Sequence, residues 1–192
     1  MAELEKQTQA STCMLLLEMV ATPTLLFNTE TWVNITKDEV GKINQAHYEV
    51  LKRVFEQGDS TPYYGILMET GYWPFSYVVI YKRLMFFHHL IHSDERRVAR
   101  KVVRNQMDGK GKGETWFGGV DEWLQKLELE RKEEGIIKYR KSEWKKKVKE
   151  QLNEWIKKEM KEQKSKMKKL RFTDTTGRQN YLDICKMDQL RK

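Results

Sequence analysis

Lysine side chains recur near the end of the chain at spacings that suit contact with a row of phosphates. Residues 138–171 carry 15 basic and 5 acidic residues, a net charge of +10. Ammonium groups along a helix neutralise phosphates and release their counterions, which gives affinity for nucleic acid without reading its sequence. The predicted phosphate contacts are Lys145, Lys146, Lys149, Lys157, Lys158, Lys161, Lys164, Lys168 and Lys169, with Lys110 and Lys112 as secondary candidates.

Two other interpretations of this basic segment stay open. Several glutamates stand at helical spacing from the lysines, which is also typical of a solvated face. An anionic membrane would attract the same charges, but the tryptophans fall on the apolar stripe, where core packing accounts for them without lipid. We therefore expect nucleic acid as the partner and no membrane. Contact between lysine and phosphate does not distinguish RNA from DNA.

His88 and His92 are the one pair with the spacing of metal ligands. They are four residues apart and share a helix face, which suits two imidazoles on one ion. However, the glutamate of a zincin motif is absent, no third ligand is evident, and the neighbouring residues are aromatic. A structural role is favoured, so the sequence predicts neither a metal nor a cofactor, with His88 and His92 as the candidates if a metal is bound.

No set of catalytic residues emerges. The sequence lacks a glycine-rich phosphate loop before a helix, a nucleophile elbow and a Cys-x-x-Cys pair, so we expect no enzyme activity of its own. Two cysteines, Cys13 and Cys185, are too few for a disulfide scaffold. The longest apolar stretch, residues 13–27, is interrupted by Glu18 and Pro23 and is shorter than the roughly 20 residues of a membrane span. With no secretory signal pattern at the start, we expect an intracellular protein, nuclear or cytoplasmic, that is not secreted.

The elements that must position these residues are predicted to be helices. Thr36 and Glu39 form a capping-box pattern, and the apolar spacing beyond them predicts a helix with Gly58 as its stop. Pro62 in a first turn and Gly71 at a terminus bound a shorter helix. Residues 75–91 are apolar on nearly every side, which predicts the most buried helix in spite of the β-prone run 77–81.

Three further segments complete the predicted arrangement. Residues 93–95 are expected to cap a helix that carries Val98, Val102 and Val103 and ends near residue 108. Residues 109–119, GKGKGETWFGG, have the composition of a flexible connector. Apolar residues from Trp144 to Leu170 keep to one face of a helix of about 27 residues, roughly 40 Å long.

The predicted fold class is all-α. A compact helical body of about five helices occupies residues 1–108, the glycine-rich connector follows at 109–119, and a basic amphipathic helical arm fills 120–192. The 192 residues have a net charge of +8. Residues 138–192 hold 19 basic and 8 acidic residues, which leaves 17 basic and 20 acidic residues before them. The excess positive charge therefore belongs to the arm.

Residues 60–90 carry a family resemblance in the stretch STPYYGILMETGYWPFSYVVIYKRLMFFHHL. This stretch resembles the region downstream of the reverse transcriptase palm in polyproteins of non-LTR-type retrotransposons. The pattern begins around Phe27, in LFNTETWVNITKDEV, and continues through VRNQ at 103–106, the element around Gly113 and Trp116, and SKMKKLRF at 165–172. It covers most of the chain from about residue 12 onward.

The resemblance implies a thumb-like helical module that helps to hold the template-primer duplex of an RNA-directed DNA polymerase. The palm aspartates, an endonuclease motif and a downstream Cys/His cluster are missing here. Polymerase activity in isolation is not expected, because two-metal phosphoryl transfer needs carboxylates to hold the ions. We expect a fragment, a degenerate copy or a domesticated remnant. The alternatives are a protein-interaction adaptor built on the same helical body, and a remnant with no function.

Overall fold

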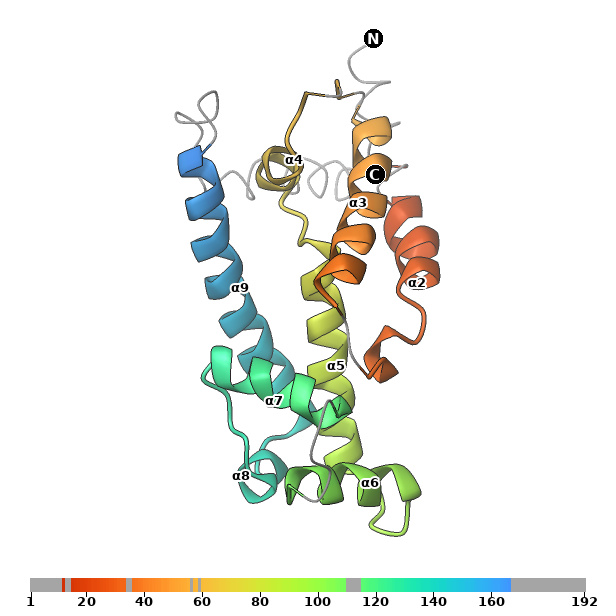
Figure 1. Ribbon diagram of the computed structural model, residues 1–192, viewed down its shortest axis with the longest axis vertical. Helices are drawn as coiled ribbons and strands as arrows, with labels where there is room; N and C mark the ends of the chain where they lie inside the picture. The colour runs from red at the N-terminus through yellow and green to blue at the C-terminus, as the bar shows by residue number, and fades with distance from the viewer. Residues whose placement is uncertain are drawn as a thin grey trace, which may run out of the picture. The chain divides into compact units, whose positions relative to one another are not determined.

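The computed structural model of the chain describes residues 12, 15–33, 36–55, 57–58, 60–109 and 115–166, and the side chains of residues 37, 69 and 164–166 lie outside this description. The described residues form helices and loops with no strand among them, so the all-α class is confirmed (Figure 1). In chain order the elements are η1 (a π-helix, Leu17–Ala21), α2 (Thr22–Leu25), η2 (a 3-10 helix, Thr29–Thr31), α3 (Lys37–Val54), α4 (Tyr63–Thr70), α5 (Phe75–Ile91), α6 (Val98–Met107), α7 (Trp116–Lys126), α8 (Glu133–Ile137) and α9 (Lys141–Lys166).

The described residues form two compact units, and each unit is discontinuous in sequence. Unit 1 takes its described residues from 1–27, 41–75 and 156–192, and unit 2 from 28–40 and 76–155. Both units therefore combine residues of the predicted body with residues of the predicted arm. Residues 110–114 of the predicted connector lie outside the described residues, and Thr115–Gly119 form the cap and first turn of α7.

Local hydrogen bonds explain where the helices begin and end. The capping box is confirmed, since Glu39 Oε2 accepts from the Thr36 amide at 2.8 Å and Thr36 Oγ1 accepts from the Glu39 amide at 3.3 Å. Gly71 ends α4 as predicted, with a φ of +71° that glycine adopts without strain. Pro62 is the residue before α4 and not part of its first turn.

The predicted start of α6 at residues 93–95 is wrong. Asp94 Oδ1 accepts from the Arg96 amide at 2.8 Å, and the Asp94 carbonyl accepts from the Arg97 amide at 3.0 Å. These bonds close a turn, which is a conformation that aspartate side chains favour over helix. The helix consequently begins at Val98.

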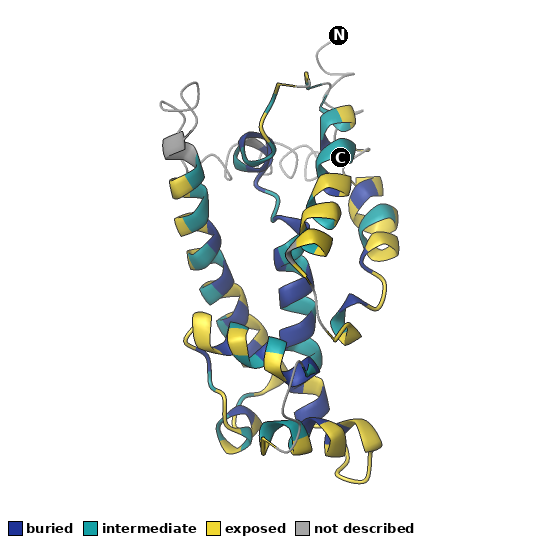
Figure 2. Cartoon of the chain, in the orientation of Figure 1, coloured by how far each residue is buried: buried dark blue, intermediate teal, exposed yellow. Residues whose placement is uncertain are grey.

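Unit 2 is built around α5, which carries buried residues on all sides (Figure 2). The indole Nε1 of Trp144, in α9, donates to the Leu84 carbonyl at 3.1 Å, and Trp144 itself is fully buried. Phe87 packs against Phe117 of α7, with ring centroids 5.5 Å apart. Bulky aromatic groups dominate core energetics because of the area they bury. The prediction that residues 75–91 form the most enclosed helix is confirmed in this unit.

The core of unit 1 centres on a histidine of α3. His47 is completely buried and stacks on Phe75 with ring centroids 3.8 Å apart. Its Nδ1 and the Tyr63 hydroxyl are hydrogen-bonded at 2.9 Å, whereas its Nε2 is buried with no partner among the described residues. Burial lowers the pKa of His47 to about 3, because the charged imidazolium would lose its hydration.

Acid should therefore destabilise this protein well above the carboxylate range. As the pH falls from 6.5 towards 4, the unfolded chain takes up a proton at His47 and the native protein does not, so this group lowers the unfolding free energy with a slope that rises to about 1.4 kcal/mol per pH unit. H47Q should reduce the slope of unfolding free energy against pH, measured by urea titration. H89Q, at an exposed histidine, should keep the slope. Equal slopes for wild type and H47Q would contradict the assignment.

Gly119 and Gly41 should respond in opposite ways to alanine. A Cβ at Gly119, in the first turn of α7, would stand 2.9 Å from Nη2 of the buried Arg83, so G119A should lower the unfolding free energy by about 1–3 kcal/mol. A Cβ at Gly41 meets nothing within 4 Å in α3, and G41A should raise it by about 0.5–1 kcal/mol. Urea unfolding followed by circular dichroism tests both variants. A neutral G119A would mean that Arg83 moves aside without cost.

Candidate nucleic-acid interface

Helix α9 presents the predicted phosphate-binding lysines, and its apolar stripe determines which way they face. The helix starts where the Glu143 carboxylate accepts from the Arg140 amide at 2.9 Å. Buried side chains then recur every four residues, at Trp144, Val148, Leu152 and Ile156. Burial of this stripe turns the remaining surface of α9 to solvent. The long helix predicted from Trp144 is helical through 166, and residues 167–192 lie outside the described residues, so the arm as a whole stays a prediction.

The first lysine cluster lies on the part of α9 that belongs to unit 2. It consists of Lys145, Lys146 and Lys149, whose side chains are all exposed. Lys145 and Lys149 are one turn apart, so they share a face of the helix. Lys149 Nζ lies 5.9 Å from the ring centroid of Tyr81, and Lys146 Nζ lies 4.0 Å from Glu150 Oε1. An exposed pair at that distance contributes less than about 1 kcal/mol, so Lys146 remains available to a phosphate.

The second lysine cluster lies on the part of α9 that belongs to unit 1. It consists of Lys157, Lys158 and Lys161, again all exposed. Lys161 follows the other two by four and three residues, the separations at which helical side chains are neighbours. Glu159, between them in sequence, accepts a hydrogen bond from the Tyr64 hydroxyl at 2.9 Å. That hydrogen bond connects the Glu159 carboxylate to α4.

The other predicted contacts are not tested by the structure. Lys164 belongs to α9, but its side chain is outside the description. Lys168 and Lys169 lie beyond the described residues, and so do Lys110 and Lys112 in the predicted connector. The six lysines of the two clusters are therefore the part of the predicted site whose side-chain exposure the structure describes.

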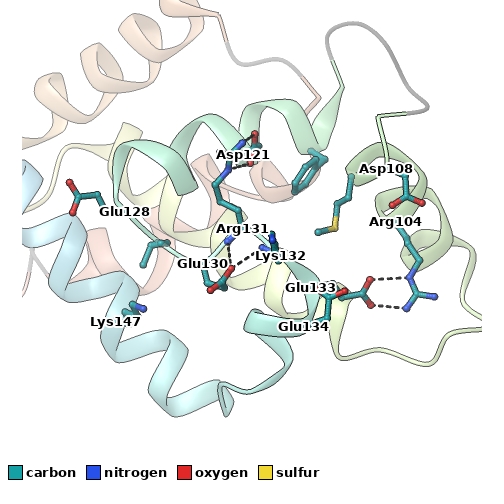
Figure 3. Close-up of a pocket in the computed structure, with 13 residues that line it drawn as sticks. Arg104, Asp108, Asp121, Glu128, Glu130, Arg131, Lys132, Glu133, Glu134 and Lys147 are labelled. Atoms are coloured by element: carbon teal, nitrogen blue, oxygen red, sulfur yellow. Dashed lines mark hydrogen bonds and ion pairs between the residues drawn. The ribbon is translucent and has the colours of Figure 1, made fainter.

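An acidic pocket of about 1060 Å³ lies in unit 2 and contrasts with the lysine clusters (Figure 3). Its charged lining residues are Asp108, Asp121, Glu128, Glu130, Glu133, Glu134, Arg104, Arg131, Lys132 and Lys147. Two of these cations are already paired, because Arg104 Nη2 lies 2.7 Å from Glu133 Oε1 and Arg131 Nε lies 2.6 Å from Asp121 Oδ1. Because six carboxylates and four cations line this pocket, its net negative charge disfavours the binding of a polyanion.

A basic surface that sequence reasoning missed lies on α6 and the turn before it. Arg96, Arg97 and Lys101 have exposed side chains. Val98 and Val102, which the apolar pattern assigned to the same helix as Val103, are 75% and 46% exposed, whereas Val103 is 4% exposed. The pair Arg96-Arg97 stood next to a predicted helix start and could have drawn attention to this surface.

The inner face of α6 is held by an ion-pair network to α8. Arg104 donates from Nε and Nη2 to the two oxygens of Glu133, at 3.0 and 2.7 Å, and Arg100 Nη2 donates to Glu133 Oε1 at 3.0 Å. The bonds to Arg104 in particular hold the pKa of Glu133 below its usual range. Arg100 also donates to the Ser93 carbonyl. The network fixes which face of α6 points outward.

The histidine pair has the geometry of a structural contact. The rings of His88 and His92 stack with centroids 3.9 Å apart, so they do not direct lone pairs to one point. His88 Nε2 donates to the Tyr139 carbonyl at 2.9 Å, and His92 Nδ1 donates to the His88 carbonyl at 2.9 Å. Burial lowers the pKa of His88, which favours the neutral ring. No group of three potential ligands occurs among the described residues, and nothing in this arrangement favours a metal.

No protein family matches this chain, and neither a curated protein nor a solved structure matches it. Within the described residues, none of the helices combines the length and apolar character needed to cross a membrane. The function is therefore inferred from the residues and geometry of the chain itself.

Removing the Glu133 carboxylate should destabilise unit 2. E133Q leaves Arg100, whose side chain is 11% exposed, short of its charged partner, and we expect a loss of about 2 kcal/mol, between the values for surface and fully buried pairs. E150Q removes the exposed partner of Lys146 and should change stability by less than about 0.5 kcal/mol. Thermal unfolding of both variants measures the difference. Equal losses of stability in E133Q and E150Q would show that the network stabilises the protein no more than an exposed ion pair does.

Proposed function

We propose that this chain is a non-catalytic, helical nucleic-acid-binding module that contacts the phosphate backbone through the lysines of α9. The observation that carries the proposal is the exposure of all six lysines in the two lysine clusters on a helix whose opposite stripe is buried. Because the core already holds the backbone of α9 in place, the conformational freedom lost on binding is confined to the lysine side chains.

The charge balance of α9 supports the proposal. The helix contains ten lysines and five glutamates. Two of the glutamates are engaged elsewhere, because Glu143 accepts from the backbone at the helix start and Glu159 accepts from Tyr64. Each lysine that meets a phosphate releases condensed counterions, and this release drives binding at low salt. Recognition of this type places no demand on base sequence.

A retroelement origin is part of the same proposal. The resemblance of residues 60–90 to the segment that follows the palm of non-LTR-type reverse transcriptases supports it, and that segment forms α4 and α5 here. In the parent RNA-directed DNA polymerase a helical module downstream of the palm helps to hold a duplex. The chain carries no recognisable set of palm aspartates, so binding without polymerisation is the activity that we propose.

A protein-interaction adaptor is the second candidate, and a specific observation favours it. Apolar side chains along η1 and the residues next to it in unit 1 are exposed, among them Met19 at 68% and Phe27 at 78%. Contiguous exposed apolar side chains mark interaction surfaces in soluble proteins. If the adaptor role holds, M19S and F27S should abolish the cellular role, and four lysine-to-glutamate changes in α9 should leave it intact. A remnant without function would tolerate all of these changes.

Salt dependence gives the direct test of nucleic-acid binding. The logarithm of the affinity for a nonspecific DNA duplex should fall linearly with the logarithm of salt concentration. Replacing the three lysines of either cluster by glutamine should reduce the magnitude of that slope by about 0.9 for each lost phosphate contact, so by up to about 2.7 for each triple variant. Fluorescence anisotropy with a labelled duplex over a range of salt concentrations measures both slopes.

A matched triple variant controls for net charge. Lys42, Lys126 and Lys132 are exposed and lie outside α9. K42Q, K126Q and K132Q together remove the same charge as either cluster variant and should leave the slope nearly unchanged. An affinity that is independent of salt, or no binding at micromolar protein, would rule out the proposal. An equal loss in the control and cluster variants would rule out α9 as the contact.

A further inference from the structure

We propose that α6 reads base edges in the major groove of double-stranded DNA, as a second contact surface distinct from the lysine clusters of α9. The inference rests on the proposed function, since it presupposes that the chain binds nucleic acid. It adds a second site, names the groove that this site enters, and predicts a preference for DNA over RNA. Contact between lysine and phosphate alone gives none of these.

The position of α6 suits entry into a groove. The helix runs from Val98 to Met107 and follows α5 after the turn at 92–97. Both helices belong to unit 2, apart from the first residue of α5, and Figure 1 shows α6 crossing the end of α5 at a steep angle. Two steeply crossing helices joined by a turn form the arrangement in which a second helix is offered to the major groove. The turn and the start of α6 are exposed in Figure 2.

The outward face of α6 carries side chains with the chemistry of base recognition. Arg97, Lys101 and Asn105 follow one another at intervals of four residues, and all three are exposed. Arginine and lysine pair with the acceptor edge of guanine, and asparagine pairs with the donor and acceptor of adenine. Val98 and Val102 occupy the adjacent stripe, and both leave apolar surface open to solvent. Apolar side chains in a groove contact the methyl group of thymine.

The inner face of α6 is anchored firmly enough to hold such a surface in register. Val103 is buried, and the Arg100 and Arg104 guanidinium groups are bound to Glu133. Glu95 Oε1 lies 3.3 Å from Arg104 and 3.6 Å from Arg100, so that carboxylate is shared with the same network. These contacts fix the rotation of α6 about its own axis, and therefore which residues point outward.

The charges around the outward face favour an anionic partner. One carboxylate oxygen of Asp94 accepts a hydrogen bond from the Arg96 amide in the turn. Glu95 and Glu133 balance the inner arginines, Arg100 and Arg104. Arg96, Arg97 and Lys101 therefore give the outward face a local excess of positive charge, suited to phosphates at the rim of a groove.

The geometry selects double-stranded DNA over double-stranded RNA. The major groove of B-form DNA is about 12 Å wide and admits an α-helix. The major groove of A-form RNA is deep and narrow, so side chains cannot read it. A helix of ten residues is about 15 Å long, enough for a few base pairs. An acidic amphipathic helix of another protein could also meet the valines and the cations, and the experiment separates the two partners.

The test is selection of preferred sequences by the full chain from a pool of randomised DNA duplexes, followed by anisotropy on the enriched and a scrambled duplex. We expect a short enriched motif bound roughly tenfold or more tightly than the scrambled duplex, the size of discrimination that one bidentate base contact supplies. N105A and K101A should reduce this ratio towards one. Because both positions are exposed, thermal unfolding of these variants should match that of wild type.

A lysine of α9 provides the matched control. K161A should weaken binding to the enriched and the scrambled duplex by the same factor and leave their ratio unchanged, since it removes a phosphate contact only. The same sequence as an RNA duplex should be bound with no preference over a scrambled RNA. A photoreactive residue placed at Val102 should crosslink to a DNA base of the enriched duplex.

The failures can be told apart. Salt-dependent binding with no enriched motif would overturn the role of α6 and leave the proposed function standing. No binding to any nucleic acid would overturn both. A motif whose preference survives N105A and K101A, or an equal preference in RNA, would also overturn the role of α6. If the photoreactive residue at Val102 never crosslinks to the enriched duplex, as expected for a face that docks a protein, α6 does not enter the groove and the proposal is wrong.

Discussion

Enclosure of α5 is the constraint on which unit 2 depends. Most of α5 is covered by protein, so its buried polar groups need partners within the chain, and an unsatisfied buried polar group costs about 1–3 kcal/mol. Arg83 donates to the Trp116 carbonyl at 3.2 Å, and His88 donates to the Tyr139 carbonyl at 2.9 Å. Lys82 lies 3.0 Å from a carboxylate oxygen of Glu30. Each of these bonds ties α5 to a different segment, so the polar groups of α5 position the surrounding segments of unit 2.

The surfaces that face solvent follow from the way these segments are held. Trp144, Val148 and Leu152 orient the first lysine cluster by burying the opposite stripe of α9. Glu133 orients α6 through its bonds to Arg100 and Arg104. One helix is therefore placed by apolar burial and the other by charged hydrogen bonds. The Glu133 carboxylate, which pairs with the inner arginines of α6, also lines the acidic pocket, where the excess of carboxylates disfavours phosphate.

Helix periodicity and capping chemistry predicted much of this fold. Residues 75–91 were assigned to a helix with the bounds that α5 has, and the capping box at Thr36 is formed. Both features depend on residues that are close together in the chain, so the sequence alone is enough to predict them. The start of α6 was misplaced because Asp94 forms a turn in competition with the helix. The exposure of Val98 was also missed, because the face of α6 that is buried depends on its packing against the later helices α7 and α8, which periodicity alone does not show.

The indole proton of Trp144 has a consequence for the kinetics of opening. This proton is completely buried and is donated to the Leu84 carbonyl inside α5. It cannot reach solvent unless α9 parts from α5 at that point, so its exchange with deuterium reports the rarest separations of the two helices. Backbone amides near helix termini exchange through local fraying and report much smaller openings. The rate of hydrogen exchange at this one side chain therefore measures how often the slowest opening exposes the core of unit 2.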